Sequence, residues 1–293
     1  MLKNQEMQRK LLIAQLNKAI SMNNERQLER AVSQYFKELK QEVLDNLEEY
    51  WSEYQLLQGQ VDLIIAPVEE SHERYYSILA KHDRKEYKLG NKEAERLIKI
   101  INEQSAEKSI RKRIRGYIKK KDNLFGTIEW TEEDLLNKVF IASKRTLARV
   151  TSDLNRIITD GYTSGKGINI VARMLTTRFD QLATWEAKRI ARTEIHNAHN
   201  RGTMDKYQEF GVEYTMWIAA DDERTRESHL EINGEIIRLG DTYSNGLKYP
   251  GDTDGPIEEW INCRCSNAPF VIPYGYAAPP MEQFTENDLI KIR

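Results

Sequence analysis

The sequence predicts an α+β protein, with a long helical N-terminal half followed by a small mixed C-terminal module with a few short strands. Three observations support this fold class. Apolar residues recur at three-and-four spacing from Leu28 to Leu57, the period of one helix face, for about eight turns. Charged helical patterns then continue to Phe210. Beyond Gly211, short runs rich in β-branched and aromatic residues alternate with turn signals, as in a small sheet.

The first two predicted helices cover residues 3–20 and 28–57, with Asn23 and Asn24 between them as capping residues. The apolar stripe of the second helix needs a packing surface. Another helix of the same chain and a partner subunit both fit such a stripe.

Glycine and proline residues are expected to interrupt the segment that follows residue 57. Gly59 and Pro67 are expected to close it, because proline lacks the backbone N–H that a helix interior needs. The apolar run 61–66 between them is too short to assign to a helix or a strand. Residues 69–106 are again helical, and we expect Gly90 to end one helix before a second begins.

A fresh helix is predicted over residues 131–159, with Thr131 as N-cap and Asp134 at the capping-box position. The glycine-rich stretch 161–167 is interpreted as a helix-to-helix turn. It differs from a phosphate-binding loop, which needs four residues between its glycines and a Ser or Thr after the lysine. The remaining predicted elements are helices over 168–175 and 180–210, strands over 213–219, 235–239 and 267–272, and a short final helix over 283–292.

These elements suggest three parts. The first is an elongated helical region over residues 1–125, the second a domain over 126–272, and the third an irregular tail over 273–293 that is rich in Pro, Gly and Ala.

Charge is balanced overall but clustered locally. The 44 basic and 46 acidic residues give a net charge of −2, so no whole-chain field attracts nucleic acid. A run without acidic residues is predicted to contact the phosphates of DNA. Its basic residues are Lys108, Arg111, Lys112, Arg113, Arg115, Lys119, Lys120 and Lys121. The alternative is a solvated helix face beside Glu107 and Asp122.

Neither a signal-peptide core nor a membrane span is predicted, because the apolar runs are short. We therefore expect no membrane partner. The two cysteines, Cys263 and Cys265, are separated by one residue, which strains a mutual disulfide and fits synthesis in a reducing cytoplasm.

Two histidines on the predicted helix over 180–210 raise the possibility of chemistry. His196 and His199 stand three residues apart, whereas zinc proteases place theirs four apart with a glutamate between. A metal-dependent hydrolase or transferase using these residues with His229 is one alternative. Buried ion pairs of Arg192 and Glu194 that tie the helix to the C-terminal module are the interpretation we favour.

Two polar runs, 222–229 and 262–265, can be brought together by turn signals at Asn233-Gly234 and at 249–256. Three soft ligands would meet there: His229, Cys263 and Cys265. They make a weak metal site, because zinc favours four ligands and the fourth is missing. The alternative, which we favour, is a polar network in which Arg224, Arg226 and Arg264 bond to carboxylates and backbone carbonyls. No metal, cofactor or catalytic residue is expected on this interpretation.

This combination resembles the head-morphogenesis domain of tailed-phage minor head proteins, the family of the Mu F protein and of the minor capsid protein of phage SPP1. The resemblance covers roughly residues 130–272. The motifs that carry it are Ala191-Arg-Thr-Glu194, Trp217, Asp222-Glu-Arg-Thr-Arg-Glu-Ser-His229, Asn233-Gly234, Tyr249-Pro-Gly-Asp252 and Asn262-Cys-Arg-Cys265. The Tyr-Pro-Gly-Asp insertion is similar to the branch found in phages of Gram-positive hosts.

The resemblance implies a structural protein and not an enzyme. It implies a minor head protein made in the host cytoplasm, present in the virion at the portal vertex, and associated with packaged double-stranded DNA, whose delivery some relatives influence. Expected partners are the portal protein and the major capsid or scaffolding protein. Self-association through the N-terminal helices is a further expectation, as is docking of the Leu28–Leu57 stripe on the portal or on sister copies. A stand-alone DNA-binding protein is the remaining alternative.

The resemblance also implies which residues form the structural motif. They are Arg192, Glu194, Trp217, Asp222, Arg224, Arg226, His229, Asn262, Cys263, Arg264 and Cys265. Other family members carry a four-ligand zinc pattern, Cys-x-x-Cys followed by His-x-x-Cys. The equivalent positions here are Arg226, His229, Trp260 and Cys263, so two of those four ligands are replaced.

Overall fold

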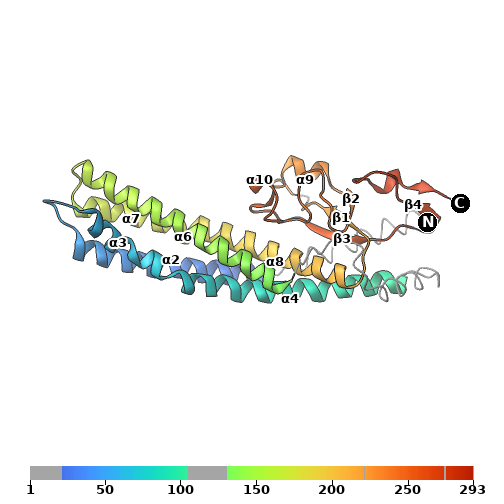
Figure 1. Cartoon of the computed structure of the whole chain (residues 1–293), viewed down its shortest axis with the longest axis horizontal. Coiled ribbons are helices and arrows are strands. Elements are labelled where there is room, and N and C mark those ends of the chain that lie inside the picture. Colours follow the sequence, from blue (N-terminus) through green and yellow to red (C-terminus); the bar gives the residue numbers. More distant parts are fainter. Residues whose placement is uncertain (1–21, 105–130, 221, 274, 293) are drawn as a thin grey trace. The chain divides into compact units, whose positions relative to one another are not determined.

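The computed structural model describes residues 22–104, 131–220, 222–273 and 275–292 (Figure 1). It confirms the predicted fold class, a mostly helical N-terminal part and a small C-terminal region of short antiparallel strands. The predicted helix over 3–20, the basic run 108–121 and the proposed boundary near residue 125 lie outside the described residues. In the described ranges, no helix combines the length and apolar character that crossing a bilayer requires.

The chain divides into two compact units. The first, here called the helical unit, comprises Met22–His82 and Leu136–Ala191. The second, here called the mixed unit, comprises the described residues of Asp83–Leu135 and Arg192–Arg293. The division falls inside three helices, so each unit is built from segments that are distant in sequence.

The helical unit buries the long apolar stripe against its own chain. Helix α2 (Met22–Tyr50) packs against α3 (Gln58–Glu70), α7 (Ile168–Gln181) and the π-helical turn η1 (Leu182–Glu186). The side chains of its stripe are at most 1% exposed. They are Leu28, Val32, Tyr35, Phe36, Leu39, Val43 and Leu47. The chain itself therefore covers the part of the stripe from Leu28 to Leu47, which rules out docking of a partner on that part, whereas Tyr54 and Leu57 at its end stay exposed.

The predicted limits of this first region need correction. Asn23 and Asn24 lie inside α2 and do not cap it. Asn24 is buried, where its amide donates to the His82 carbonyl at 3.1 Å and its Oδ1 lies 2.8 Å from His82 Nδ1. At the other end, α2 stops at Tyr50, and Tyr54 and Leu57 beyond it are exposed.

Helix α3 contains both residues that were expected to end the segment, Gly59 and Pro67. In a helix, the missing N–H of Pro67 would leave the Leu63 carbonyl without its i+4 donor. The Asn46 side-chain amide of α2 donates to this carbonyl at 2.8 Å. A side chain from a neighbouring helix thus replaces the lost backbone bond.

The glycine-rich stretch after α6 (Glu132–Thr163) is a helix-to-helix turn, as predicted. Gly165 has a φ of 68°, and the N–H of Lys166 donates to the Gly161 carbonyl at 2.9 Å, which closes the end of α6. Thr131 also caps α6 as predicted, since its Oγ1 accepts from Asp134 N at 3.2 Å. The next helix is longer than expected, because α7 and η1 run on without a break into α8 (Ala187–Glu209).

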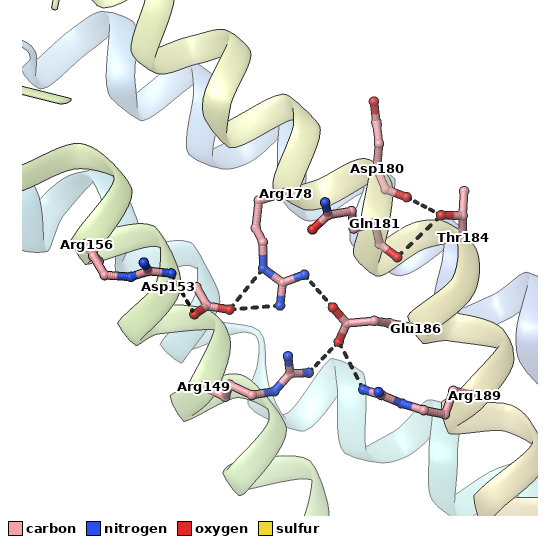
Figure 2. Close-up of polar contacts among 9 residues, drawn as sticks. All are labelled: Arg149, Asp153, Arg156, Arg178, Asp180, Gln181, Thr184, Glu186 and Arg189. Atoms are coloured by element: carbon pink, nitrogen blue, oxygen red, sulfur yellow. Dashed lines mark hydrogen bonds and ion pairs between the residues drawn. The ribbon is translucent and has the colours of Figure 1, made fainter. Parts of the chain in front are cut away.

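A polar cluster centred on Glu186 joins α6, α7 and η1 (Figure 2). The Glu186 side chain is only 1% exposed, and its Oε2 accepts from Arg149 Nη2 at 2.6 Å while its Oε1 accepts from Arg178. Arg189 lies 3.5 Å away, and Arg178 also donates to Asp153 at 2.9 Å. Burial alone would raise the pKa of Glu186, but the hydrogen bonds from Arg149 and Arg178 outweigh it and lower the pKa. Glu186 is therefore a buried, ionised carboxylate.

In the mixed unit, α4 (His72–Gln104) continues through Gly90, so the break predicted there is wrong. A Cβ on Gly90 would lie 2.1 Å from the His199 carbonyl oxygen, and one on Gly202 would lie 2.1 Å from the Tyr87 carbonyl oxygen. The two glycines let the backbones of α4 and α8 approach closely. Gly90 therefore serves helix packing and does not end a helix.

The predicted strands form one antiparallel sheet in the order β2-β1-β3, with bounds Ile236–Arg238, Tyr214–Ile218 and Ser266–Phe270. Met216 in the central strand pairs with Ile236 on one side and Ala268 on the other. All five residues of β1 are buried, as expected for a central strand packed on both faces.

The predicted final helix over 283–292 is wrong. Phe284 instead pairs with Ile236 of the sheet and is buried beside Tyr214 and Met216. Beyond it come a 3-10 turn η2 (Glu286–Asp288) and strand β5 (Ile290–Lys291), which pairs with β4 (Tyr276–Ala277). An apolar anchor on the sheet edge thus overrides the local helical pattern.

Candidate functional site

Two short helices and a sharp turn position the candidate site in the mixed unit. After β1, Oδ1 of Asp222 accepts from the backbone N of Arg224 at 3.0 Å, and this turn leads into α9 (Glu227–Glu231). Helix α10 (Ile257–Trp260) ends in a turn at Asn262, whose φ is 57°. Asparagine tolerates this left-handed conformation better than most residues, and here it redirects the chain into β3.

The two polar runs meet around His229. Its Nδ1 lies 3.4 Å from Cys265 Sγ and 3.8 Å from Cys263 Sγ, and all three residues are buried. On the other side of the ring, Nε2 lies 2.9 Å from Oε2 of Glu259, an ion-pair distance without hydrogen-bond alignment. Ser228 Oγ donates to the same carboxylate oxygen at 2.9 Å.

Aromatic side chains pack around the imidazole. The Trp217 ring stands edge-on to His229 with 5.1 Å between ring centroids. Trp217 and both cysteines share one apolar cluster with Tyr243. The imidazole and the thiols are thus enclosed by apolar groups, where an uncompensated charge is costly.

The arginines of the motif bond within the module. Arg264 forms a two-pronged ion pair with the carboxylate of Asp222, and Arg226 donates to the Ile261 carbonyl. Arg192 on α8 donates to Asn262 Oδ1 at 3.3 Å. Arg224 is the most exposed of the four, with its Nη2 3.7 Å from Asp222. Of the predicted network of Arg224, Arg226 and Arg264, the last two make hydrogen bonds within the module, Arg224 lies only at ion-pair distance, and Arg192 adds a further bond.

A small pocket opens onto this network. It is lined by Ala220, Arg224, Thr225, Arg226, His229, Asn262, Cys263, Arg264 and Cys265. The three candidate metal residues are therefore among those that line this small pocket.

The thiols and the Asp222 carboxyl have shifted pKa values. The paired Arg264 guanidinium holds the pKa of Asp222 well below its usual range. A hydrogen bond from Cys263, and then His229, lowers the pKa of the Cys265 thiol, although burial opposes this. The same bond and burial raise the pKa of Cys263. One thiolate centred on Cys265 is therefore favoured, with the remaining proton on Cys263.

The histidines of α8 lie in a different setting. His199 Nδ1 is 3.1 Å from Glu86 Oε1 of α4, and both side chains are buried. Burial, followed by the neighbouring positive charges, lowers the pKa of His196 to about 3, so its ring is neutral. Among the described residues, the cluster with three potential metal ligands is His229, Cys263 and Cys265, which neither His196 nor His199 joins.

Glu194 does not make the predicted ion pair with the module. It interacts instead with the buried carboxyl of Asp83, on α4. Burial raises the pKa of Glu194 to about 7. Burial, and then the negative charges of Glu194 and Glu86, raise the pKa of Asp83 well above its usual range. The two carboxyls therefore share protons near neutral pH, a pairing that helix spacing alone does not suggest.

Sequence reasoning also missed Glu259. Asp252, which precedes the cysteine pair by about ten residues, accepts from the backbone N of Asp254 at 3.1 Å and so stabilises its own turn. A signal was present in the Ile-Glu-Glu-Trp run just before Asn262, because it places carboxylates within one turn of the cysteine pair.

The family model for "Phage Mu protein F like protein" matches residues 152–268. Minor head protein GP7 of Bacillus phage SPP1 is 28% identical over 129 residues, which cover 42% of each chain. An uncharacterized protein of Haemophilus influenzae is 39% identical over 80 residues, 27% of this chain and 16% of that protein. The NAD(+)--arginine ADP-ribosyltransferase EFV of Enterococcus faecalis is 30% identical over 118 residues, 38% of this chain and 24% of that protein.

Each match therefore spans less than half the length of the relative. No solved structure matches the chain. The matched residues include Glu186 with Arg178 and Arg189, helix α8 and the His229 site, whereas Arg149 and α4 lie outside the match. Residues 152–268 therefore form a Phage Mu protein F-like domain, and the chain is a distant homologue of the SPP1 minor head protein GP7.

Proposed function

We propose that this protein is a structural component of a tailed-phage head, which joins the portal vertex during assembly and stays with the packaged double-stranded DNA. The match of residues 152–268 to the Mu F-like family carries this proposal. The geometry of the motif supports it, because Arg226 and Arg264 are bonded to a backbone carbonyl and a carboxylate of the same module. These bonds stabilise the loops of the module, so that it can present a fixed surface to a partner protein.

The position in the head tests the proposal directly. Antibody labelling of purified heads should mark one vertex, and the label should persist after DNA packaging. Label spread over the whole shell, or label absent from heads, would contradict a portal-vertex role.

Portal binding needs a surface other than the buried α2 stripe. We assign it to the connection between α2 and α3, where Tyr54 is fully exposed and Leu57 is 56% exposed. Large apolar side chains that are exposed singly gain free energy when a partner covers them. The double substitution Tyr54→Ser and Leu57→Ser should weaken co-purification with the portal about tenfold or more.

Ile141→Ser is the matched control, since Ile141 on α6 is 48% exposed in the same unit. It should leave the portal yield unchanged. Equal yields for the double variant and wild type would remove the α2–α3 connection as the contact surface.

DNA association is assigned to the basic run 108–121, which lies outside the described residues. Replacing Arg111, Arg113, Arg115 and Lys119 by Gln should reduce the slope of log K against log salt by roughly 3.6, if each cation neutralises one phosphate. The control replaces four exposed cations of the helical unit. They are Arg30, Lys37, Arg145 and Lys188. A slope equal to that of wild type would identify the basic run as a solvated helix face.

An enzymatic role is the second candidate, favoured by the similarity to a protein named as an ADP-ribosyltransferase. The match covers 24% of that protein. Incubation with labelled NAD⁺ and an arginine-rich protein acceptor separates the two roles. Transfer of label would support the enzyme, and a purely structural protein should transfer none.

A further inference from the structure

We propose that Cys263 Sγ, Cys265 Sγ and His229 Nδ1 bind one zinc ion, with Glu259 orienting the imidazole. The three ligand atoms lie within 4.8 Å of one another. Each residue is at most 3% exposed. Two thiolates and one imidazole form a ligand set that binds zinc in preference to cations that favour oxygen ligands, such as Mg²⁺.

The distances fit tetrahedral coordination. With Zn–S near 2.3 Å and Zn–N near 2.0–2.1 Å, a tetrahedral angle separates a sulfur from a nitrogen ligand by about 3.6 Å. The two sulfur-to-Nδ1 distances, 3.4 and 3.8 Å, bracket this value. The side chains therefore need only small shifts to hold an ion.

The hydrogen-bonding capacity of the His229 imidazole favours a bound cation over a metal-free cluster in which the three side chains only pack together. Nδ1 can accept or donate one hydrogen bond, yet two sulfur atoms face it. The opposite nitrogen, Nε2, lies 2.9 Å from the Glu259 carboxylate. Zinc-bound histidines usually donate their second N–H to a carboxylate, and the Glu259 carboxylate is within reach to accept it once the two groups align.

A backbone hydrogen bond fixes one of the two sulfurs. The backbone N–H of Cys265 donates to Cys263 Sγ at 3.4 Å. Zinc binds cysteine as the thiolate, so binding would release the proton that the thiol pair otherwise keeps.

This ligand set differs from the four-ligand pattern of other family members. Arg226 stands at one ligand position of that pattern and donates instead to the Ile261 carbonyl, and Trp260 stands at another. Cys265 supplies a ligand from a new position, immediately before β3. Three protein ligands leave one coordination position for water or a small anion from the adjoining pocket.

The test uses the full chain purified in buffer that contains zinc and then desalted. Elemental analysis should find about one zinc per chain, and substitution by Co²⁺ should produce a near-ultraviolet thiolate charge-transfer band with the intense visible bands of tetrahedral cobalt. Cys265→Ser should abolish the stoichiometric metal and weaken the charge-transfer band. Glu259→Gln should lower metal affinity about 10- to 100-fold while preserving the cobalt spectrum, as a positioning residue would.

His196→Gln is the matched control. It removes a buried histidine outside the cluster, so metal content should not change, whereas a hydrolase site built on His196 would lose its metal. Circular dichroism of each variant checks its folding. If the cysteine variants do not fold, thiol labelling of the wild-type chain decides, because both thiols should react only after a chelator removes the metal.

Three results would overturn the proposal. The first is wild-type protein without metal or a cobalt charge-transfer band. The second is full metal content in a folded Cys265→Ser variant. The third is thiol labelling at the same rate with and without the chelator.

Discussion

The pKa values of two glutamates that lie eight residues apart are shifted in opposite directions. Glu186 in the helical unit is surrounded by Arg149, Arg178 and Arg189, so it remains ionised. Burial raises the pKa of Glu194 in the mixed unit to about 7, and its interaction with another acid, Asp83, opposes this rise only in part. The same residue type on one helical run is thus ionised in one unit and partly protonated near neutral pH in the other.

The difference lies in how far nearby groups offset burial. At Glu186 the hydrogen bonds from Arg149 and Arg178 outweigh burial and lower the pKa, whereas at Glu194 the interaction with Asp83 opposes burial but does not outweigh it. Helices α6 and α7 present guanidinium groups to Glu186 (Figure 2), whereas α4 presents carboxyls to Glu194. The two units should therefore respond differently to mutation and to pH.

The largest expected effect is in the helical unit. Glu186→Gln removes the charge that compensates Arg149 and Arg178, and breaking a buried ion pair from one side costs about 3–5 kcal/mol. Urea unfolding of this variant should show that loss of stability. Glu48→Gln, an exposed carboxylate on α2, should change stability by less than about 0.5 kcal/mol. If both variants unfold at the same urea concentration, the Glu186 cluster does not stabilise the fold.

The next effect is a pH dependence from the mixed unit. A carboxyl whose folded pKa is raised stabilises the fold below its unfolded pKa, and this contribution is lost as pH rises through the folded pKa. For Glu194 the window runs from the ordinary value of 4.5 to about 7. Stability should therefore fall between pH 5 and pH 8, by roughly 3 kcal/mol at most.

Asp83→Asn should flatten this dependence, because an amide can donate to the ionised Glu194 carboxylate and removes the shared negative charge. The measurement is the free energy of unfolding at several pH values, with Glu231→Gln as an exposed control. A wild-type profile that rises with pH over this range, or an Asp83→Asn profile parallel to wild type, would contradict shared protons at this pair.

The sequence predicts what local patterns determine. The apolar stripe of α2, the Thr131 cap, the glycine turn and the three strands all follow from periodicity and turn chemistry within a short window. The meeting of the two polar runs at His229 also followed from turn signals between them. In these places local preference and tertiary structure agree.

The failures share one physical cause, a partner that is distant in sequence. Pro67 remains helical because Asn46 of another helix bonds to the Leu63 carbonyl. Gly90 continues a helix because it faces the backbone at His199. Local sequence rules for proline and glycine do not take account of a hydrogen-bond donor on another helix or of close packing against another helix's backbone.

The candidate site shows the same limit. The cysteines and His229 were recognisable as ligands, but Glu259 and Asp83 were not recognised as neighbours. The spacing rule for charged pairs on a helix predicts partners of opposite charge. It therefore does not predict that one acidic side chain lies next to another. Such pairs become visible only when the packing of α4 against α8 is known.

The smallest predicted effect concerns a third, partly exposed carboxylate, that of Asp222. Its pair with Arg264 has side chains 37% and 17% exposed, and surface pairs contribute about 0.2–1 kcal/mol. Asp222→Asn should therefore lower stability by no more than about 1 kcal/mol at neutral pH. Because Arg264 lowers the pKa of Asp222, this contribution is present at neutral pH and is lost as pH falls through the folded pKa, the opposite direction to Glu194. Glu223→Gln is the adjacent exposed control. An Asp222→Asn loss as large as that of Glu186→Gln would mean that exposure does not separate these carboxylates and that the Arg264 pair is a principal support of the module.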